Sequence, residues 1–547
     1  MGKNDAGMIK VWSMAVLLCM GVLIYPAVGW GAKDYHVGPG QPYTTIGSVP
    51  WYNLQAGDTV YIHYKSTPYY EKFLISGRGT ATQWIRVLGV PGPNGELPVI
   101  SGSNATTSTN MHYRWQSASG DNSIQWLGVI QISVRADDPN APAPMPAYIV
   151  IANLQVQDGY KTSRFTAENG VSTNYNGFAA CIYARSVQHL IIRNNILTNC
   201  GQGFYNWTGS GSDWWDGLQA DTIIHGNYFY NNGNPNSYTE HQSYTESDRV
   251  VYEYNRFGPM RTGALGSQLK DRSAGTVVRY NYIEQPAGWM LDLVEAENGA
   301  PTISSRPYYL QTFIYANVLL NTAPGTTSAN AVHWNGDHGP GGRADIGGKL
   351  FFYHNTFVMV RNESAIWKFP LFHVQQGGFS CPASVPGVID ARNNIWVNLP
   401  RTPGAPTGEM FLAGCGIENF HLGNNWISPG WTYAWSAAHS YRGTTTGAQN
   451  LFSPADNKPG FVNLAANDVH LAIGSSAIGL GGSLAPEVTN NALGLDLTPT
   501  QQYVYHQQAM ARSTSGVGSD AGAFHAVDAE ASRRRTPNQR ATRLKGK

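Results

Sequence analysis

The sequence predicts an all-β protein built from stacked coils, and three observations lead to that fold class. A short apolar segment that ends near an asparagine returns many times along the chain. Glycine is abundant, with 61 residues, and Phe, Trp and Tyr make up 12% of the chain, while only 13% of the residues are charged. No helical pattern of comparable persistence interrupts the segments between residues 145 and 430. This composition is typical of a folded, turn-rich protein.

The first element, residues 1–31, has the pattern of an export signal. Lys3 and Lys10 precede the apolar run VWSMAVLLCMGVLIY, and small residues follow it. The run is short for a membrane-spanning helix, so an uncleaved anchor is the weaker alternative. We expect a secreted or periplasmic protein that has no membrane contact once the signal is removed.

The recurring apolar segments follow at intervals of 26 to 38 residues. They are short, β-branched or aromatic, and separated by Gly, Asn, Ser and Pro, which indicates strands. Stacked coils produce such a pattern, because each coil keeps its core positions in register while its surface loops vary in length. Asparagine suits a tight bend because it tolerates left-handed backbone geometry. We therefore predict an internal ladder of Asn194, Asn227, Asn255, Asn281, Asn317, Asn355, Asn393 and Asn424.

This arrangement resembles the single-stranded right-handed parallel β-helix of pectin- and pectate-lyase-like proteins. The amino-terminal stretch adds to the resemblance, since a strand and a short capping helix lead to a turn at Gly57 and Asp58 and then to the first core strand. The segments DVHLAIGSSAIGLGG and SDAGAFHA are similar to the carboxy-terminal closure of such proteins. A propeller or sandwich, with more even spacing, is the alternative fold. The resemblance implies a β-helix over 32–430, a closure or capping region over 431–526 and a basic disordered tail over 527–547.

Charge is distributed unevenly along the chain. The whole chain carries a formal charge of +1, of which +7 lies in the last sixteen residues and +1 in the expected signal, so the body from residue 30 to 531 carries −7. A mildly acidic body argues against nucleic acid as a partner. We expect a monomer with a solvated tail.

Four cysteines remain after the signal, in a chain expected in an oxidising compartment. The pairs Cys181–Cys200 and Cys381–Cys415 are plausible, because each separation is close to one coil. Three pairings are formally possible, and four free buried thiols are the alternative.

Candidate chemistry gathers on three consecutive segments between residues 238 and 300. Parallel β-helices carry their sites on an outer face, because stacked side chains fill the interior. Segments about one coil apart would place their outward side chains next to one another. The candidates are His241 and Tyr244 on the first segment, Lys270, Asp271 and Arg272 on the second, and Trp289, Asp292, Glu295 and Glu297 on the third.

The same stretch is similar to a group of exported β-helix proteins related to polysaccharide lyases of the chondroitinase and alginate-lyase type. That group carries His-x-x-Tyr, Lys-x-Arg and Leu-Asp-Leu segments on consecutive coils. The matching residues here are His241, Tyr244, Lys270, Arg272 and Asp292. The third segment continues as VEAENG where the group has a glycine-rich turn, which places the role of Asp292 in doubt.

The resemblance implies cleavage of an anionic, uronic-acid-containing polysaccharide by β-elimination. The substrate carboxylate must then be neutralised by a cation, a base must take the C5 proton, and an acid must protonate the leaving oxygen. Arg272 suits the carboxylate. Lys270 suits the base only if its pKa is depressed. His241 or Tyr244 would be the second proton carrier, while Trp289, Asp271, Asp292 and Glu295 would contact the substrate.

Three alternatives stay open. A glycoside hydrolase would use two carboxylates among Asp271, Asp292 and Glu295. A non-catalytic glycan-binding protein would keep its binding when Lys270 and Arg272 are replaced, whereas a lyase would lose turnover at nearly unchanged stability. No cofactor is certain, although Asp292, Glu295 and Glu297 are possible ligands of Ca²⁺.

A second cluster follows in the glycine-rich segment 331–348. His333, Asp337 and His338 lie close together there, at a spacing that matches no standard zinc pattern. A flexible loop is the better interpretation.

Overall fold

A computed structural model describes the chain in residues 31–113, 124–136, 144–209, 217–322, 331–337, 342–361, 371–374, 385–402, 410–414, 417–434, 444–452, 458–504, 508–512 and 520–526. The expected signal, the expected basic tail, His338, Cys381 and Cys415 lie outside these residues. Structural statements below concern the described part of the chain.

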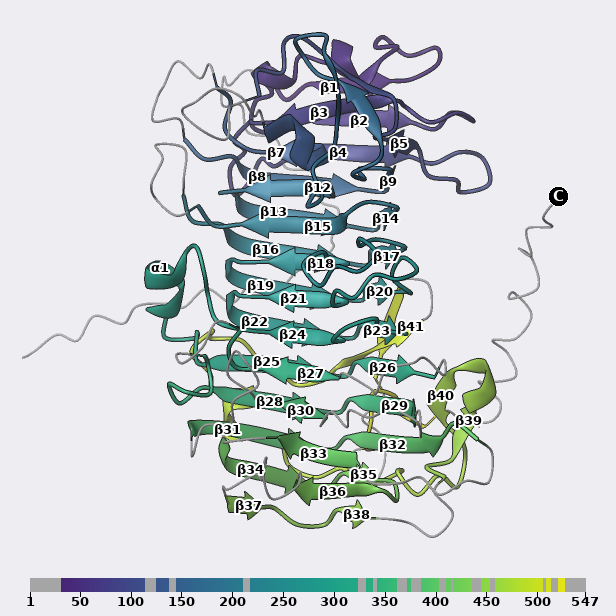
Figure 1. Ribbon diagram of the computed structural model, residues 1–547, viewed down its shortest axis with the longest axis vertical. Coiled ribbons are helices and arrows are strands. Elements are labelled where there is room, and N and C mark those ends of the chain that lie inside the picture. The colour runs from purple at the N-terminus through teal and green to yellow at the C-terminus, as the bar shows by residue number, and fades with distance from the viewer. Residues whose placement is uncertain are drawn as a thin grey trace, which may run out of the picture.

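The chain winds into a single-stranded right-handed parallel β-helix with three sheets along its sides (Figure 1). Consecutive strands in a coil pass from the second sheet to the first and then to the third, as β12, β13 and β14 do. The predicted fold class is confirmed. The first sheet consists of β1 (Asp34–Val37), β2 (Thr59–His63), β4 (Ile85–Val90), β8 (Ala147–Ala152), β13 (Gln188–Arg193), β16 (Ala220–His225), β19 (Asp248–Glu253), β22 (Ala274–Arg279), β25 (Gln311–Tyr315), β28 (Lys349–Tyr353), β31 (Val385–Arg392), β34 (Ile417–Gly423) and β37 (Thr444–Thr446).

The second sheet is parallel except where β10 meets β11, and it carries the candidate site. Its strands are β11 (Ser172–Asn174), β10 (Arg164–Thr166), β6 (Ala105–Thr107), β3 (Glu71–Ile75), β7 (Gly128–Ile132), β12 (Ala180–Arg185), β15 (Gln202–Trp207), β18 (Ser243–Thr245), β21 (Leu269–Asp271), β24 (Leu291–Leu293), β27 (Val332–Trp334), β30 (Phe372–His373), β33 (Met410–Gly414) and β36 (Trp431–Ala434).

The third sheet closes each coil after the asparagine bend. Its strands are β5 (Val99–Ser101), β9 (Gln155–Gln157), β14 (Ile196–Thr198), β17 (Tyr228–Tyr230), β20 (Arg256–Phe257), β23 (Tyr282–Glu284), β26 (Val318–Asn321), β29 (Thr356–Arg361), β32 (Ile395–Pro400), β35 (Trp426–Ile427) and β38 (Leu451–Phe452). The short helices are η1 (Ile46–Ser48) and η2 (Trp51–Asn53) near the amino-terminal end, η3 (Ile124–Leu127), α1 (Ala300–Ser304), η5 (Leu464–Ala466) and η6 (Pro486–Val488). No helix among the described residues is long and apolar enough to cross a membrane.

An asparagine ladder runs through the interior at the bend between the first and third sheets, as predicted. Each ladder side chain accepts a backbone N–H from the coil before it and donates to the asparagine of the coil after it, as Asn255 does toward Asn281 at 3.0 Å. These bonds satisfy buried backbone groups that the turn leaves unpaired. The members are Asn195, Asn227, Asn255, Asn281, Asn317, Asn355, Asn394, Asn425 and Asn450.

Three predicted ladder positions are wrong by one residue. Asn194, Asn393 and Asn424 each precede the true member of the ladder, and each has a positive φ, between 55° and 59°. The left-handed residue of the bend is therefore the one before the ladder asparagine, a place taken by Tyr280 and Ala316 in other coils. In an Asn-Asn pair the sequence alone does not tell the two roles apart.

Replacing Asn195 with alanine is expected to lower the free energy of unfolding by about 1–3 kcal/mol, because it leaves buried backbone groups of Leu154 and Ile151 without partners. Replacing its exposed neighbour Asn194 with glycine, which tolerates the positive φ, should change stability by less than about 0.5 kcal/mol. Urea unfolding of the two variants checks the assignment, and equal losses would contradict it.

The carboxy-terminal region runs back along the outside of the coils. The three sheets continue through β36, β37 and β38, so the boundary predicted at residue 430 falls inside the coils. The hairpins β39 (Phe461–Asn463) with β40 (Asp468–Leu471) and β41 (Gln501–Val504) with β42 (Gln508–Ala511) follow. Tyr503 on β41 stacks on Tyr282 of β23, in the middle of the stack (Figure 1). The segment thus covers a side of the β-helix.

One of the two plausible cysteine pairs is confirmed, since Cys181 and Cys200 form a disulfide. It joins β12 to the second residue after β14 and so ties together one coil.

Candidate active site

The register of the second sheet places the candidate side chains in one outward-facing column. Tyr244, Lys270, Asp292 and His333 are successive partners on β18, β21, β24 and β27, followed by His373 on β30. Adjacent strands of a sheet lie about 4.8 Å apart. Residues 22 and 41 positions apart in sequence, such as Lys270 with Asp292 and Asp292 with His333, therefore become neighbours.

Alternation along each strand decides which side chains reach this column. In β21 and β24 the residues on either side of the central polar residue point inward and are fully buried: Leu269, Asp271, Leu291 and Leu293. Lys270 and Asp292 consequently point outward.

The prediction that Asp271 contacts substrate is wrong. Asp271 is the inward neighbour of Lys270 and is fully buried. Its carboxylate accepts hydrogen bonds from the Thr245 hydroxyl at 2.7 Å and the Thr276 hydroxyl at 2.5 Å. It also accepts one from the Ser273 backbone N–H at 3.1 Å. Asp271 therefore stabilises the interior of the coil and has no access to a ligand.

Lys270 lies between two carboxylates. Its Nζ donates to Asp292 Oδ2 at 2.9 Å and to Asp337 Oδ2 at 2.5 Å. Burial disfavours the charged form, but attraction to Asp292 and Asp337 outweighs it and raises the pKa of Lys270 above its usual range. A base needs a shift in the opposite direction, so Lys270 is a permanent cation in this arrangement.

Arg272 connects two loops, those that follow β24 and β27, to the column. Its Nε donates to the Tyr244 hydroxyl at 2.8 Å, its Nη1 to the Glu295 carbonyl at 2.7 Å, and its Nη2 to Asp337 Oδ2 at 2.8 Å. Glu297 Oε2 lies 3.2 Å from Nε. The guanidinium is nearly inaccessible to solvent, so these partners replace its water.

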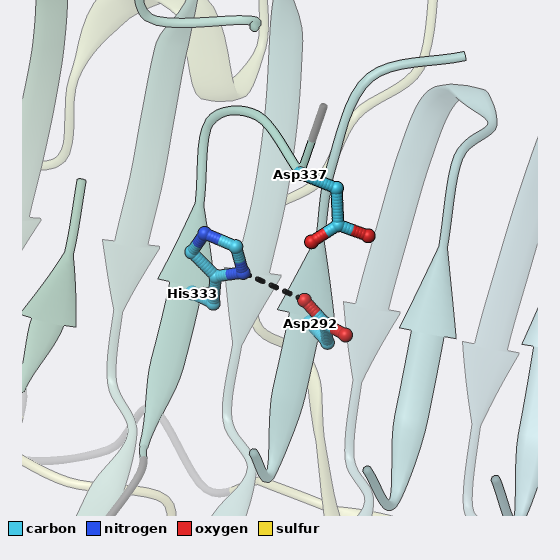
Figure 2. A group of neighbouring side chains, drawn as sticks. All are labelled: Asp292, His333 and Asp337. Atoms are coloured by element: carbon cyan, nitrogen blue, oxygen red, sulfur yellow. Dashed lines mark hydrogen bonds and ion pairs between the residues drawn. The ribbon is translucent and has the colours of Figure 1, made fainter. Parts of the chain in front are cut away.

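Asp292 and His333 form a buried dyad. His333 Nδ1 lies 2.8 Å from Asp292 Oδ1, with the two side chains facing one another (Figure 2). Burial would raise the pKa of Asp292, but Lys270 and the bond to His333 hold it well below its usual range. An ionised Asp292 accepts a hydrogen bond from the Nδ1–H of His333. In that tautomer of the imidazole, Nε2 is the acceptor. This is the arrangement that orients an imidazole as a general base.

Trp289 covers the imidazole of His333. The indole stacks on the ring of His333 with centroids 5.3 Å apart and meets His373 edge-on at 4.8 Å. It is only partly buried, so it also borders the outer surface of the column. Its predicted role in sugar stacking stays a prediction.

His241 and Tyr244 lie on the other side of Lys270. His241 Nδ1 accepts the Ser267 backbone N–H at 2.8 Å, and burial, assisted by Lys270, lowers the pKa of His241 to about 3. His241 is therefore neutral near neutral pH, which argues against its predicted role as a proton carrier. Burial raises the pKa of Tyr244. The Tyr244 hydroxyl accepts the Arg272 Nε–H at 2.8 Å and donates its own proton to Glu297 Oε2 at 3.4 Å, a distance at which the hydrogen bond is weak.

Glu295 and Glu297, named above as possible Ca²⁺ ligands, have other partners among the described residues. Glu295 accepts the Asp337 backbone N–H at 2.8 Å and lies 3.6 Å from Arg272, and Glu297 pairs with the same arginine. A different trio, Asp292, His333 and Asp337, offers ligand atoms within 4.8 Å of one another (Figure 2). Ca²⁺ requires six to eight oxygen ligands. Here one ligand is an imidazole and the Lys270 ammonium already bridges the two carboxylates, so the residues do not fit Ca²⁺.

Glu246 is an additional carboxyl group that received no role from the sequence. Its Oε1 accepts the backbone N–H groups of Glu297, at 2.6 Å, and Gly299, at 3.2 Å, and so fixes the loop that leads into α1. Its Oε2 has no hydrogen-bond partner among the described residues. Burial raises the pKa of Glu246 to about 7.

Glu246 should make the protein less stable as the pH rises. The raised pKa means that the folded state holds the Glu246 proton more tightly than the unfolded state does. Its contribution is therefore fully present below the unfolded pKa of about 4.3 and is lost as the pH rises through about 7. The loss amounts to about 4 kcal/mol across that interval. Glu246→Gln should remove this part of the pH dependence in urea titrations at pH 5 and pH 8, and an unchanged difference would contradict the assignment.

Sequence reasoning underestimated two residues, His333 and Asp337. Both were placed in a flexible glycine-rich loop, but His333 belongs to β27 and Asp337 follows it closely. The available signal was the triplet Val-His-Trp, which alternates in the same way as Leu-Lys-Asp and Leu-Asp-Leu. It was obscured because this coil is 41 residues long between Asp292 and His333.

Comparison with known proteins bears on the fold alone. No protein-family model matches the chain, and no curated protein matches it. Among solved structures it is similar to the pectate lyase Pel9A, at 12% identity and a TM-score of 0.41, over 91% of this chain and 98% of that one. It is similar to the PL6 family alginate lyase AlyGC, at 10% identity and a TM-score of 0.38, over 87% of this chain and 56% of that one. It is also similar to a GH136 lacto-N-biosidase from Eubacterium ramulus, at 10% identity and a TM-score of 0.40, over 77% and 68%.

Proposed function

We propose that this protein is an exported enzyme that cleaves a uronic-acid-containing polysaccharide by β-elimination at the column formed by Tyr244, Lys270, Asp292 and His333. The observation that carries the proposal is the convergence of two buried cations, Lys270 and Arg272, on one carboxylate beside an aspartate-oriented imidazole. A carboxylate-binding pair next to a base is what proton removal at C5 of a uronate requires.

Lys270 and Arg272 hold the substrate carboxylate in this proposal. Both are charged at every accessible pH, because neighbouring acids and Tyr244 raise their pKa values despite burial. Their charges stabilise the enediolate that develops when C5 loses its proton. The interaction is strong because both cations are withdrawn from water.

His333 is the base and Tyr244 the acid. His333 Nε2 takes the C5 proton, while Asp292 stabilises the imidazolium that results. The electron pair of the C5–H bond forms the C4–C5 double bond, and the bond from C4 to the glycosidic oxygen breaks. The leaving oxygen takes the proton of the Tyr244 hydroxyl. The sequence suggested Lys270 as the base. The proposal assigns that role to His333 instead, because its neighbour Asp292 is ionised and can stabilise the imidazolium.

A glycoside hydrolase is the second candidate, and Glu246 is the observation that favours it. A carboxyl group with a pKa of about 7 is suited to protonate a leaving group near neutral pH. However, Glu246 is almost completely buried, behind the loop that Arg272 holds. Elimination therefore remains the preferred reaction.

Incubation of residues 32–547 with pectate, alginate and chondroitin, with and without Ca²⁺, tests the proposal. Elimination gives products with a conjugated double bond, so ultraviolet absorbance should rise on at least one polymer. The rise should persist in a chelator, because Lys270 and Arg272 supply the positive charge. New reducing ends without absorbance would favour the hydrolase, and neither signal would favour a non-catalytic glycan-binding protein.

A further inference from the structure

We infer that the side chain of Asp337 occupies the position of the substrate carboxylate and competes with the substrate for Lys270 and Arg272. The inference deepens the proposed function and rests on it for the identity of the displacing group. It assigns to Asp337 a role in specificity: only a ligand that brings its own carboxylate can take over both cations.

The geometry of Asp337 is that of a bound carboxylate ligand. A single oxygen, Oδ2, accepts hydrogen bonds from Lys270 Nζ at 2.5 Å and from Arg272 Nη2 at 2.8 Å. Lys270 and Arg272 precede Asp337 by 67 and 65 residues in the sequence. They lie on and directly after β21, whereas Asp337 follows β27. Charge-assisted bonds of this kind are the ones that an anionic ligand would make.

Asp337 is also the member of the cluster that can leave. Its side chain is 28% exposed, whereas the side chains of Lys270 and Arg272 are 9% and 3% exposed. Asp292, the other carboxylate on Lys270, is 6% exposed and is held by His333 and by the Ser267 hydroxyl. Asp337 therefore covers the two cations on their solvent side.

Release of Asp337 requires only a side-chain rotation. The backbone N–H of Asp337 is bonded to Glu295 Oε2 at 2.8 Å, which anchors the main chain independently of the carboxylate. Once rotated, the carboxylate regains water, while Lys270 keeps Asp292 and Arg272 keeps Tyr244 and the Glu295 carbonyl. The exchange leaves no buried charge unpaired if a substrate carboxylate takes the vacated place.

The exchange has a cost for binding and a benefit for selectivity. Each anionic substrate must displace an internal anion, so its affinity is lower than the two cations alone would give. A neutral sugar displaces Asp337 less readily, because it brings no negative charge to replace the carboxylate that Lys270 and Arg272 share.

Carboxylate rescue of Asp337→Ala tests the inference without knowledge of the polymer. Removal of the carboxylate should create a site for free acetate, so acetate should raise the melting temperature of Asp337→Ala relative to chloride at equal ionic strength. Wild type and Asp345→Asn, altered in the same segment, should show no such difference. Addition of Arg272→Lys to Asp337→Ala should reduce the acetate effect.

A second variant, Asp337→Asn, replaces Asp337→Ala if that variant does not fold. The probe is then trigalacturonate, and Asp337→Asn should bind it with an affinity about tenfold above that of wild type.

The outcomes separate this inference from the proposed function. No acetate effect in Asp337→Ala, or equal trigalacturonate affinity in Asp337→Asn and wild type, would overturn the inference even if wild type cleaves a uronate polymer. An acetate effect in a protein that cleaves no uronate polymer would support the competition by Asp337 and reject the proposed function.

Discussion

His333→Asn is expected to lower kcat on a uronate polymer by about 10²–10⁴-fold, the usual contribution of a general base. The asparagine amide can still donate to Asp292 from the position of Nδ1, so the buried carboxylate keeps a partner. What the variant lacks is the acceptor at Nε2. The loss should therefore fall on kcat with little change in KM or in the free energy of unfolding.

A matched control variant, His225→Asn, makes this prediction specific. His225→Asn alters an imidazole that also pairs with an acid, Glu253, but lies on the first sheet outside the column. It should leave kcat unchanged. Initial rates of ultraviolet absorbance measure kcat. Retention of wild-type kcat by His333→Asn would exclude His333 as the base, and His241 and Tyr244, on the other side of Lys270, would become the candidates.

The fold could be predicted from the sequence because a coil repeats its own constraints. Each coil needs an apolar strand and a buried asparagine, so the same sequence pattern recurs many times. An ambiguous segment can therefore be interpreted from the clearer segments around it. The ambiguity persists only where two asparagines adjoin, as at Asn194 and Asn195, where one bends the backbone and the other fills the ladder.

The site was less predictable, because its residues occur in one place rather than in every coil. They also come from coils of unequal length. Tyr244, Lys270 and Asp292 follow at intervals of 26 and 22 residues, and their adjacency could be expected. Asp337 lies 67 residues after Lys270 in the sequence, yet the two side chains are in contact. Because the loops between them vary in length, the sequence separation does not predict this contact. Charge balance was equally hidden: Lys270 and Arg272 looked like an open cationic patch, whereas the folded chain pairs both with its own acids.

Arg272→Ala is expected to lower the free energy of unfolding by about 1–3 kcal/mol, in addition to abolishing turnover. The sequence alone led to the expectation of nearly unchanged stability, which treats the arginine as a surface group. In the folded chain its side chain is 3% exposed and neutralises Asp337 and Glu297, while Nη1 satisfies the Glu295 carbonyl. Its removal leaves Asp337 with Lys270 as its remaining cation and withdraws the guanidinium from Glu297 and from the Glu295 carbonyl. The expected cost is the loss of these charge-assisted hydrogen bonds in a partly buried site.

An exposed arginine provides the matched control. Arg249 pairs with Asp221 at 2.5 Å, but its side chain is 45% exposed, so Arg249→Ala should cost less than about 1 kcal/mol. Urea unfolding of both variants at equal pH measures the difference. Equal small losses would mean that water reaches the acids around Arg272, in which case the two cations are not desolvated and the strong carboxylate binding proposed for them is not available. A larger loss confined to Arg272→Ala would show that Arg272 is a desolvated cation, which the proposed exchange of Asp337 for a substrate carboxylate requires.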